Sequence, residues 1–540
     1  MTGVLIAIGG TVIVRLFFLQ VSYADEYQAT AERQHNALLL DQSRRGDIFF
    51  EDKDGVLVPA ATTHRTYTLE GNPRQIENPT ALYEKFVALL PLDKDTFLER
   101  ASARDTTYTV FMQNISRDTA ANIANFTTPE IWLSKDEKRV YPQGTMASHL
   151  LGFVGFSDIG RSGRYGLEQQ YEDILNGSDA RSGFAQNGSD LILTIDPHIQ
   201  SIAHELGTKL VETWNAVSAG ILVLEPKTGA ILAMDSMPGF NPNAYQEVKD
   251  YDIFLNPFTQ KVFEMGSIVK PLTMAAGLDA RSITEATTYY DAGQVQIGDA
   301  TLSNYDGKGR GLQRMYDILD QSLNTGAVFI MQQLGKRAFH DYMRRFGLGE
   351  STGVDLGQEV AGNLSNLEIG NNVEYATASF GQGIAVTPLG LASALSAVAN
   401  GGELMRPYIV KRIEDTKGVS TETLPAVRRR VLRTETTEIV SRMLADVVDK
   451  TLAGGIVSMP RYRIAAKTGT AQISNKTAGG YSDMYLHTFF GYAPAFDPRF
   501  LILLYLEEPR GVRYASQTLS EPFRKLAEFI ITYYKIPPDR

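Results

Sequence analysis

A serine and a lysine lie three positions apart in "FEMGSIVKPLTMAAGL", residues 263–278. In a helix, residues with this spacing share one face, so the hydroxyl of Ser267 and the amine of Lys270 are neighbours. A serine hydroxyl is a weak nucleophile until an adjacent base takes its proton, and a lysine is such a base once burial or a nearby cation lowers its pKa. Pro271 fits a helix that begins close to the serine, where free backbone N–H groups face a developing anion. The pair predicts covalent catalysis by Ser267.

Two further motifs follow this pair. Ser322-Leu323-Asn324 is the only Ser-x-Asn sequence in the chain, and Lys467-Thr468-Gly469-Thr470 lies in a segment with strand character, "YRIAAKTGTAQI". Each motif alone has a structural explanation, because Ser and Asn suit the start of a helix and a Ser-x-x-Lys pair often arises by composition. Their occurrence together, in the order Ser-x-x-Lys, Ser-x-Asn, Lys-Thr-Gly, predicts one site built from three distant segments.

The chain contains a second Lys-Thr-Gly, at residues 227–229 in "VLEPKTGAIL". This copy precedes Ser267 and lies between two apolar runs, with a proline and a glycine within five residues. That pattern is typical of a hairpin turn, in which Gly229 supplies the turn geometry and Lys227 lies in solvent. We therefore assign the chemistry to the copy at residues 467–469.

Length and composition limit the classes of protein. The chain has 540 residues, of which 43% are hydrophobic, so we expect a folded protein of two or three domains. Its net charge of −10 argues against nucleic acid as a partner. The absence of cysteine excludes disulfides, thiolate catalysis and cysteine-ligated metals, and the seven histidines form no HExxH motif. We predict no metal site.

The N-terminal segment "GVLIAIGGTVIVRLFFLQV", residues 3–21, is apolar apart from Thr11, Arg15 and Gln20. Its length is just sufficient to cross a bilayer, and no cleavage site with small residues follows it. We expect an uncleaved anchor; a buried N-terminal helix is the alternative.

The order of elements suggests how the three motifs are held together. Residues 22–189 are of mixed polarity and rich in turn signals, with strand-like runs at 66–69 and 107–112 and helical runs at 80–90 and 119–126. From residue 190 we expect a strand, a helix that starts at a proline, a long amphipathic helix and a hairpin, then a helical region from about 267 to 450, and finally three strands and a helix. This order suggests a sheet assembled from both ends around an inserted helical block.

At this point the chain resembles a known family, the penicillin-binding serine D,D-transpeptidases, which carry these three motifs in this order. Further stretches resemble class B of that family. They are "RRGDIF", "GTMASHLLGFVG", "GRYGLEQQYEDILNG", "TGAILAMDSMPGFNPN", "ASFGQGIAVTPLGLA" and "YRIAAKTGTAQ". Within class B, "RFGLGE" and "GYAPAFDPRF" favour the division-type, FtsI-like branch.

The resemblance implies an α+β fold in three parts. Residues 1–21 would be a transmembrane anchor, and residues 22–189 a non-catalytic pedestal of mixed α/β structure, of the dimerisation type. Residues 190–540 would be the penicillin-binding transpeptidase domain, an antiparallel sheet flanked by helices with a helical subdomain. The protein would be a single-pass protein of the cell membrane with its catalytic domain outside the cytoplasm.

The resemblance also implies the reaction. Ser267 would attack the penultimate D-alanine of a peptidoglycan stem peptide, while neutral Lys270 takes the proton. Backbone N–H groups of Ser267 and Thr470 would form the oxyanion hole. An amine of a neighbouring stem would then resolve the acyl-enzyme into a cross-link, and a β-lactam would acylate the same serine. This reaction would need neither a metal nor an organic cofactor.

The other motif residues take supporting roles in this scheme. Ser322 would relay a proton to the departing D-alanine, and Asn324 would hold Lys270 and the substrate amide. Lys467 would keep the pKa of Lys270 low. With Thr468, Gly469 and Thr470 it would also bind the substrate and its terminal carboxylate.

Partners and alternatives complete the expectation. The implied partners are stem peptides, β-lactams, the membrane, an FtsW-type glycan polymerase and other division proteins. The alternatives are an elongation-type transpeptidase, a serine β-lactamase or penicilloyl sensor, an inert scaffold, and an α/β protein whose motifs are accidental. The anchor and the pedestal-like region argue against a β-lactamase, which is normally a small secreted domain.

Overall fold

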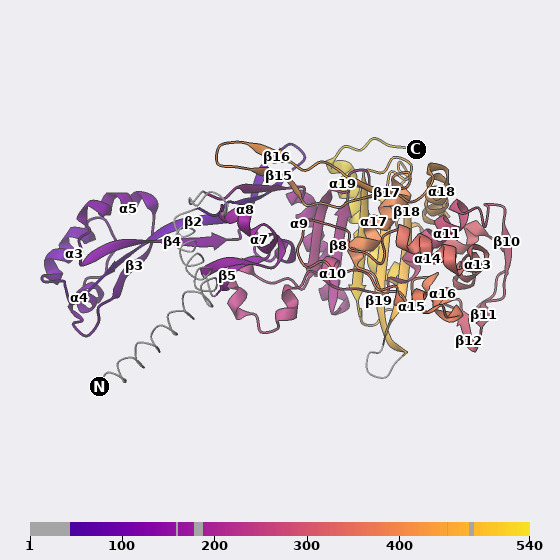
Figure 1. Ribbon diagram of the computed structural model, residues 1–540, viewed down its shortest axis with the longest axis horizontal. Helices are drawn as coiled ribbons and strands as arrows, with labels where there is room; N and C mark the ends of the chain where they lie inside the picture. Colours follow the sequence, from indigo (N-terminus) through magenta and orange to yellow (C-terminus); the bar gives the residue numbers. More distant parts are fainter. Residues whose placement is uncertain (1–43, 158–159, 178–186, 451, 475–479) are drawn as a thin grey trace, which may run out of the picture.

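The computed structural model describes residues 44–157, 160–177, 187–450, 452–474 and 480–540. The molecule is elongated, with a small N-terminal lobe at one end and a larger body of strands and helices at the other (Figure 1). The predicted anchor, residues 1–21, lies outside the described residues. Within the described ranges, no helix is both long and apolar enough to cross a bilayer.

The N-terminal half of the molecule is built on a seven-stranded sheet in the order β16-β15-β7-β1-β2-β3, with β4 also paired to β2. Its strands are β1 (Ile48–Glu51), β2 (Leu57–Gly71), β3 (Thr109–Ile115), β4 (Ile131–Val140), β7 (Asp190–Leu193), β15 (Val410–Glu414) and β16 (Ser420–Glu422). Strands β1 and β7 run parallel, and the other pairs are antiparallel. The predicted division between residues 189 and 190 falls inside this sheet, because β7, β15 and β16 come from the C-terminal side of it.

Strand β2 extends from this sheet into the small lobe, which has an apolar core of its own. The helices of the lobe are α3 (Pro79–Val87), α4 (Lys94–Ser102), α5 (Arg117–Ile123) and the 3-10 helix η2 (Ala124–Phe126). The strand-like runs predicted at 66–69 and 107–112 fall in β2 and β3. The helical runs predicted at 80–90 and 119–126 correspond to α3 and to α5 with η2.

Several short elements connect this half to the larger body. They are α6 (Ser148–Leu151), β5 (Phe153–Ser157), β6 (Gly160–Arg164), α7 (Gly166–Gln170) and α8 (Glu172–Asn176). At their centre the carboxylate of Glu168 is fully buried between the guanidinium groups of Arg45 and Arg139. This ion-pair cluster joins α7 to β4 and to the segment before β1.

The larger body contains a five-stranded antiparallel sheet in the order β18-β19-β20-β8-β9. Its strands are β8 (Ser218–Leu224), β9 (Ile231–Met237), β18 (Ala465–Ser474), β19 (Tyr481–Ala493) and β20 (Phe500–Glu507). The structure confirms the predicted hairpin, with Gly229 at a φ of +83° in the turn between β8 and β9. It also confirms a sheet assembled from both ends of this region, since β20 pairs with β8.

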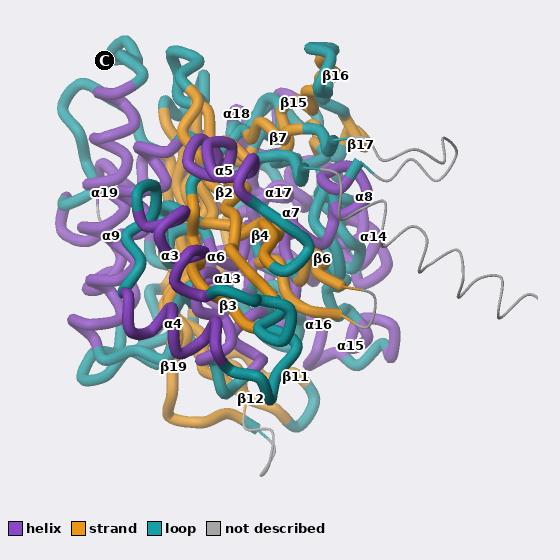
Figure 2. Tube along the Cα trace, turned by 90° about the vertical axis from the view of Figure 1, so that its left-hand side faces the viewer, coloured by secondary structure: helices purple, strands orange, loops and turns teal. Residues whose placement is uncertain are grey.

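Long helices cover the two faces of this sheet. Figure 2 shows α9 (Pro197–Trp214) and α19 (Ala515–Tyr533) on one side of the strands and α17 (Pro388–Ala399) on the other. Helix α18 (Thr434–Lys450) packs on β18 and α17, and α11 (Lys270–Asp279) packs behind both helices. The sequence suggested two helices between residues 197 and 214; the structure has one, because nothing interrupts its apolar stripe.

Most of the helical block inserted between β9 and β18 lies at the far end of the body (Figure 1). Its helices are α10 (Pro257–Gln260), α12 (Met315–Asp320), α13 (Asn324–Leu334), α14 (Lys336–Arg345), α15 (Ser365–Ile369) and α16 (Asn372–Ala378), with 3-10 turns η3 (Pro242–Glu247), η4 (Tyr251–Phe254), η5 (Gly266–Val269) and η6 (Leu452–Gly455). Three two-stranded ribbons complete it: β10 (Thr288–Asp291) with β13 (Gly311–Arg314), β11 (Gln294–Ile297) with β12 (Ala300–Ser303), and β14 (Glu403–Met405) with β17 (Val427–Arg430). Figure 1 labels α13 and β10 at the far end, whereas α10 packs against α17 nearer the centre.

Candidate active site

The turn that carries the predicted nucleophile begins at Gly266, whose φ of +62° favours glycine. Ser267 lies in the 3-10 turn η5, and Lys270 begins α11, with Pro271 in its first turn as predicted. The backbone N–H of Lys270 donates to the carbonyl of Ser267. Residues three apart are eclipsed in a 3-10 helix, so both side chains leave the same face of this turn.

The amine of Lys270 is buried and contacts both residues of the Ser-x-Asn motif. Its side chain is 1% exposed, and Nζ lies 2.6 Å from the carbonyl oxygen of Ser322 and 2.8 Å from Oδ1 of Asn324. The hydroxyl of Ser322 is 3.2 Å from Nζ. Burial and the positive charge of Lys467 hold the pKa of Lys270 well below its usual range. A neutral amine can donate one hydrogen to each carbonyl oxygen and keep its lone pair for a proton.

Ser322 reaches Lys270 through an unusual backbone conformation. Its φ is +54°, in the left-handed region that a serine seldom adopts. The next turn of chain begins α13 at Asn324, whose Nδ2 donates to the carbonyl of Ser303 at 2.9 Å. This conformation directs the carbonyl of Ser322 toward the amine of Lys270. Backbone strain of this kind often marks functional sites.

The third motif lies on β18, at the edge of the five-stranded sheet. A Cβ on Gly469 would lie 2.3 Å from Oγ1 of Thr488 and 2.9 Å from the carbonyl oxygen of Met265. Only a glycine therefore allows the strand to pack against the turn that carries Ser267. Gly381 closes the same turn from another side, since its carbonyl accepts from the N–H of Gly266 at 3.0 Å.

Lys467 is buried beside this contact. Its side chain is 2% exposed, and Nζ donates to the carbonyl of Thr468 at 3.2 Å. Burial lowers the pKa of Lys467 to about 8, against the opposing effect of the Asp320 carboxylate. The amine is thus mostly charged at neutral pH, which is the condition under which it disfavours a proton on Lys270.

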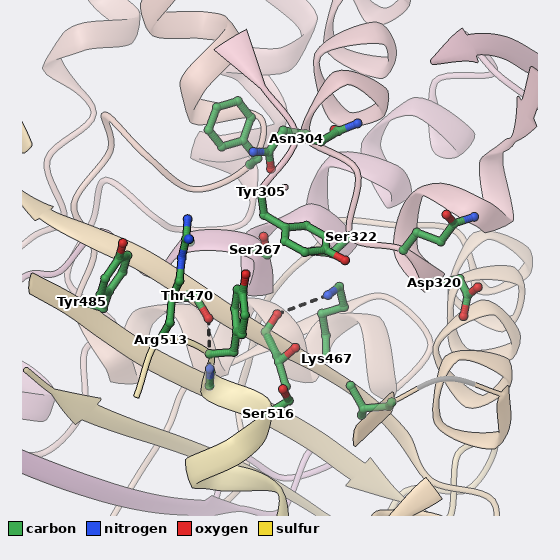
Figure 3. Close-up of a pocket in the computed structure, with 18 of the residues that line it drawn as sticks. Ser267, Asn304, Tyr305, Asp320, Ser322, Lys467, Thr470, Tyr485, Arg513 and Ser516 are labelled. Carbon is green, nitrogen blue, oxygen red and sulfur yellow. Dashed lines mark hydrogen bonds between the residues drawn. The ribbon is translucent and has the colours of Figure 1, made fainter. Parts of the chain in front are cut away.

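These side chains line one cleft of about 680 Å³. Its walls include Ser267, Ser322, Asn324, Lys467, Thr468 and Thr470, together with Gly266, Asn304, Tyr305, Arg310, Asp320, Phe380, Gln382, Tyr485, Arg513, Tyr514 and Ser516. Figure 3 shows Ser267, Ser322, Lys467 and Thr470 around the same space. Lys270 and Gly469 lie in the wall behind it. The structure thus brings every sequence-predicted site residue to one place.

The other copy of Lys-Thr-Gly, residues 227–229, is not among the residues that line this cleft. The side chain of Lys227 is half exposed and pairs with Asp497. Thr228 donates to the carboxylate of Glu225 within the same turn. These contacts confirm the structural role predicted for this copy.

Sequence reasoning missed the residues that form the mouth of the cleft. Asn304, Tyr305 and Arg310 lie in the segment between β12 and β13, and Arg513 and Tyr514 lie just before α19. The rings of Tyr305 and Tyr514 meet edge to face at 6.0 Å. No local motif marks these residues, because they come from loops whose meeting depends on the whole fold.

The described residues contain no group of three or more His, Asp or Glu side chains arranged to hold a metal ion. The three motifs bring the hydroxyls of Ser267 and Ser322, the amines of Lys270 and Lys467 and the amide of Asn324 to the cleft or its wall.

Comparison with known families decides the class of this protein. The model of the penicillin binding protein transpeptidase domain matches residues 219–528, and that of the penicillin-binding protein dimerisation domain matches residues 40–194. The chain belongs to the class B penicillin-binding proteins. It is thus an enzyme of the penicillin-binding transpeptidase type, as the three motifs predicted.

Named relatives span nearly the whole length of this penicillin-binding protein. Stage V sporulation protein D of Bacillus subtilis is 30% identical over 531 residues, which cover 94% of this chain and 81% of the relative. The peptidoglycan D,D-transpeptidase FtsI homolog of Mesostigma viride is 29% identical, covering 97% and 93%. The peptidoglycan D,D-transpeptidase MrdA of Acinetobacter baumannii is 28% identical, covering 94% and 84%.

Solved structures share the fold of this penicillin-binding protein. Penicillin binding protein 2X from Streptococcus thermophilus has a TM-score of 0.80 at 22% identity, covering 91% of this chain and 79% of that one. Penicillin binding protein 3 from Mycobacterium tuberculosis, complexed with aztreonam, has a TM-score of 0.71 at 24% identity, covering 92% and 98%.

Proposed function

We propose that this penicillin-binding protein is a peptidoglycan D,D-transpeptidase that works through an acyl-enzyme on Ser267. The observation that carries the proposal is the environment of Lys270: a buried amine in contact with Ser322 and Asn324, with Lys467 lowering its pKa. Such an amine can take the proton of a hydroxyl on the same face of its turn. The named relatives that are D,D-transpeptidases support the choice of substrate.

In the acylation step, Oγ of Ser267 attacks the carbonyl carbon of the penultimate D-alanine and its proton moves to Nζ of Lys270. The carbonyl oxygen becomes an oxyanion, which accepts hydrogen bonds from the backbone N–H groups of Ser267 and Thr470. Removing one such donor in other enzymes slows the reaction about 100- to 1,000-fold. The sharp turn at Gly266, the edge position of β18 and the presence of Ser267 and Thr470 in the cleft wall support this assignment.

The tetrahedral intermediate collapses when the terminal D-alanine leaves with a proton. The hydroxyl of Ser322, 3.2 Å from Nζ of Lys270, can relay that proton from the lysine to the leaving amine. Lys270 is then neutral again and can take a proton from the amine of an acceptor stem. That amine attacks the ester of Ser267, and Lys270 passes the proton to Oγ as the ester bond breaks, so the products are a new amide between the stems and the free serine.

A β-lactam opens on the same serine but has no leaving group to depart, so the adduct persists. A serine β-lactamase would need a water placed to hydrolyse that ester, and the match to a dimerisation domain over residues 40–194 favours the transpeptidase. We also propose that the apolar segment 3–21 anchors the chain in the cell membrane, with the cleft on the outer side, where its substrate occurs.

Within this class we propose a role in septal synthesis, with an FtsW-type polymerase and other division proteins as partners. The support is the resemblance of "RFGLGE" and "GYAPAFDPRF" to the FtsI-like branch, together with the FtsI homolog among the relatives. A fluorescent fusion should gather at the division site of growing cells. An even distribution along the side wall would favour the elongation role instead.

The enzymatic proposal is tested with the purified full-length chain, a donor pentapeptide that ends in D-Ala-D-Ala, and an amine acceptor. We expect release of D-alanine together with a cross-linked product, and neither product from Ser267→Ala. Nitrocefin should be consumed in a burst of one equivalent. Continuous nitrocefin turnover without any cross-linked product would contradict the proposal and favour a β-lactamase.

A further inference from the structure

The two cations on the sheet side of the cleft differ in their access to substrate. Lys467 is 2% exposed, and its amine already donates to the carbonyl of Thr468. Lys467 lines the cleft, but at this low exposure its ammonium acts on Lys270 through its field and is less accessible to a solvated carboxylate than an exposed cation is. Thr468 and Thr470 also line the cleft, and their hydroxyls are neutral.

Arg513 is the exposed cation beside these threonines. Its side chain lines the same cleft. Among the ion pairs of the described residues none engages its guanidinium, whereas Arg310 on the opposite wall pairs with both carboxylate oxygens of Asp306 at 2.9 Å. Arg513 therefore has its planar donor fork available for a ligand.

The backbone that follows Arg513 is fixed to the sheet. The N–H of Ala515 donates to Oγ1 of Thr470 at 3.1 Å, and Nε2 of His487 lies 3.0 Å from the carbonyl oxygen of Arg513. Thr470 and His487 are direct neighbours across β18 and β19. Burial lowers the pKa of His487 to about 4, so the ring is neutral at pH 7, and Nε2 carries the hydrogen because a carbonyl only accepts.

Two tyrosines set the direction of the guanidinium. It lies over the ring of Tyr514 at 5.5 Å, and Tyr514 meets Tyr305 edge to face across the mouth of the cleft. Figure 3 shows Arg513 beside Thr470, and it shows Tyr305 on the other side of the cleft. The stack holds a cation in the wall of the cleft, on the side of Thr470.

We propose that Arg513 is the specificity-determining residue that binds the C-terminal carboxylate of the donor stem peptide. Its guanidinium pairs with the carboxylate while the hydroxyl of Thr470, which accepts from Ala515, donates its own proton to the same group. Lys467 remains in the wall and acts on Lys270. The inference rests on the proposed function, since the carboxylate belongs to the D-Ala-D-Ala terminus or to a β-lactam that replaces it.

Benzylpenicillin and its methyl ester test the proposal, because they differ only in the charge of that carboxylate. The measurement is the second-order rate constant for acylation of Ser267 in the full-length chain, in wild type and in Arg513→Gln. A charge-assisted hydrogen bond contributes enough that the variant should react with benzylpenicillin roughly 10- to 100-fold more slowly. The rate constant of the variant with the methyl ester should stay close to that of wild type. The ratio of the rate constant for benzylpenicillin to that for the ester should therefore fall roughly 10- to 100-fold in Arg513→Gln.

Arg310→Gln is the matched control, since Arg310 lies over Tyr305 at 5.8 Å much as Arg513 lies over Tyr514. It removes one positive charge from the same cleft and should leave the ratio at its wild-type value. Arg513→Lys keeps the charge without the fork and should give an intermediate ratio.

An equal loss with both compounds in Arg513→Gln would overturn the proposal, because it would mean a structural role. An unchanged ratio, or the same change in Arg310→Gln, would also overturn it. Wild-type chain that is acylated by neither compound would refute the proposed function itself, so the two failures are distinguishable.

Discussion

Nζ of Lys270 lies 2.8 Å from Oδ1 of Asn324 and donates to it, although the two residues are 54 positions apart. The contact joins α11, which follows the turn that carries Ser267, to the start of α13 at Asn324. It also fixes the character of the base. An amide oxygen accepts a hydrogen without adding a negative charge, so Lys270 is held in place while burial and Lys467 keep its pKa low.

The first prediction exchanges that amide for a carboxylate. Asn324→Asp keeps the shape but places a negative charge against the amine, which favours the protonated form of Lys270. We expect the rate of acylation by fluorescent penicillin at pH 7 to fall about 100-fold, as for the loss of a general base. Asn324→Ala, which removes the contact without adding charge, should be affected less at this pH; equal effects would contradict the explanation.

The second prediction concerns the pH dependence of acylation. Lys467 is charged below its pKa of about 8 and neutral above it. Because its positive charge stabilises the negative charge that develops on the reacting carbonyl, the acylation rate should be level near pH 7 and fall as the pH rises through 8.

Asp320 provides the check on that assignment, since its carboxylate raises the pKa of Lys467. In Asp320→Asn the alkaline fall should begin at a lower pH, while the rate near pH 6 stays close to wild type. A fall that keeps its position in the variant would show that another group titrates.

The third prediction compares the two Lys-Thr-Gly sequences. Lys227→Ala removes an exposed ion pair with Asp497, so acylation by fluorescent penicillin should match wild type. Lys467→Ala removes the buried cation beside Lys270, and acylation should fall by at least about 100-fold if its charge is needed to keep the general base free. Similar losses in both variants would remove the distinction between the copies.

The fourth prediction concerns the pedestal. Glu168 is fully buried and accepts from Arg139 at 2.7 Å and from Arg45 at 2.6 Å. Glu168→Gln removes the carboxylate that the two buried guanidinium groups share and leaves Arg45 with Glu172 at 2.8 Å and Arg139 with Asp47 at 3.7 Å. Breaking a buried pair costs about 3–5 kcal/mol, so we expect a loss of stability at or below the lower end of this range. Urea unfolding followed by Trp132 on β4, in a Trp214→Phe background, measures the loss.

Glu205→Gln is the control for this variant. Glu205 pairs with Lys209 on the exposed face of α9, and its loss should leave the unfolding curve unchanged. The pH dependence has a defined sign. Burial alone would raise the pKa of Glu168, but Arg139 and Arg45 lower it below the ordinary value. The stabilisation is therefore complete above the ordinary pKa of glutamate and is lost as the pH falls through the folded-state value.

Local patterns predicted much of this molecule. The spacing of Ser267 and Lys270 is a property of one helical turn, and the turn at Gly229 follows from a proline and a glycine between apolar runs. The order of strands and helices predicted a sheet assembled from both ends. Each of these features is determined by a few neighbouring residues or by the order of strands and helices along the chain.

Other features depend on contacts between distant segments. The left-handed conformation of Ser322 has no signal in its own sequence, since it is imposed by the amine of Lys270 and the start of α13. The addition of β15 and β16 to the N-terminal sheet places residues 410–422 beside residue 190. The meeting of Tyr305 with Tyr514 joins two loops whose sequences resemble ordinary surface segments.

The most direct test of the central claim is the mass and position of the adduct formed with benzylpenicillin. Peptide mapping of the acylated full-length chain should find the intact penicillin mass added once, on the peptide that contains Ser267, and no adduct in Ser267→Ala. An adduct on any other residue, or one that persists when Ser267 is replaced, would contradict the account.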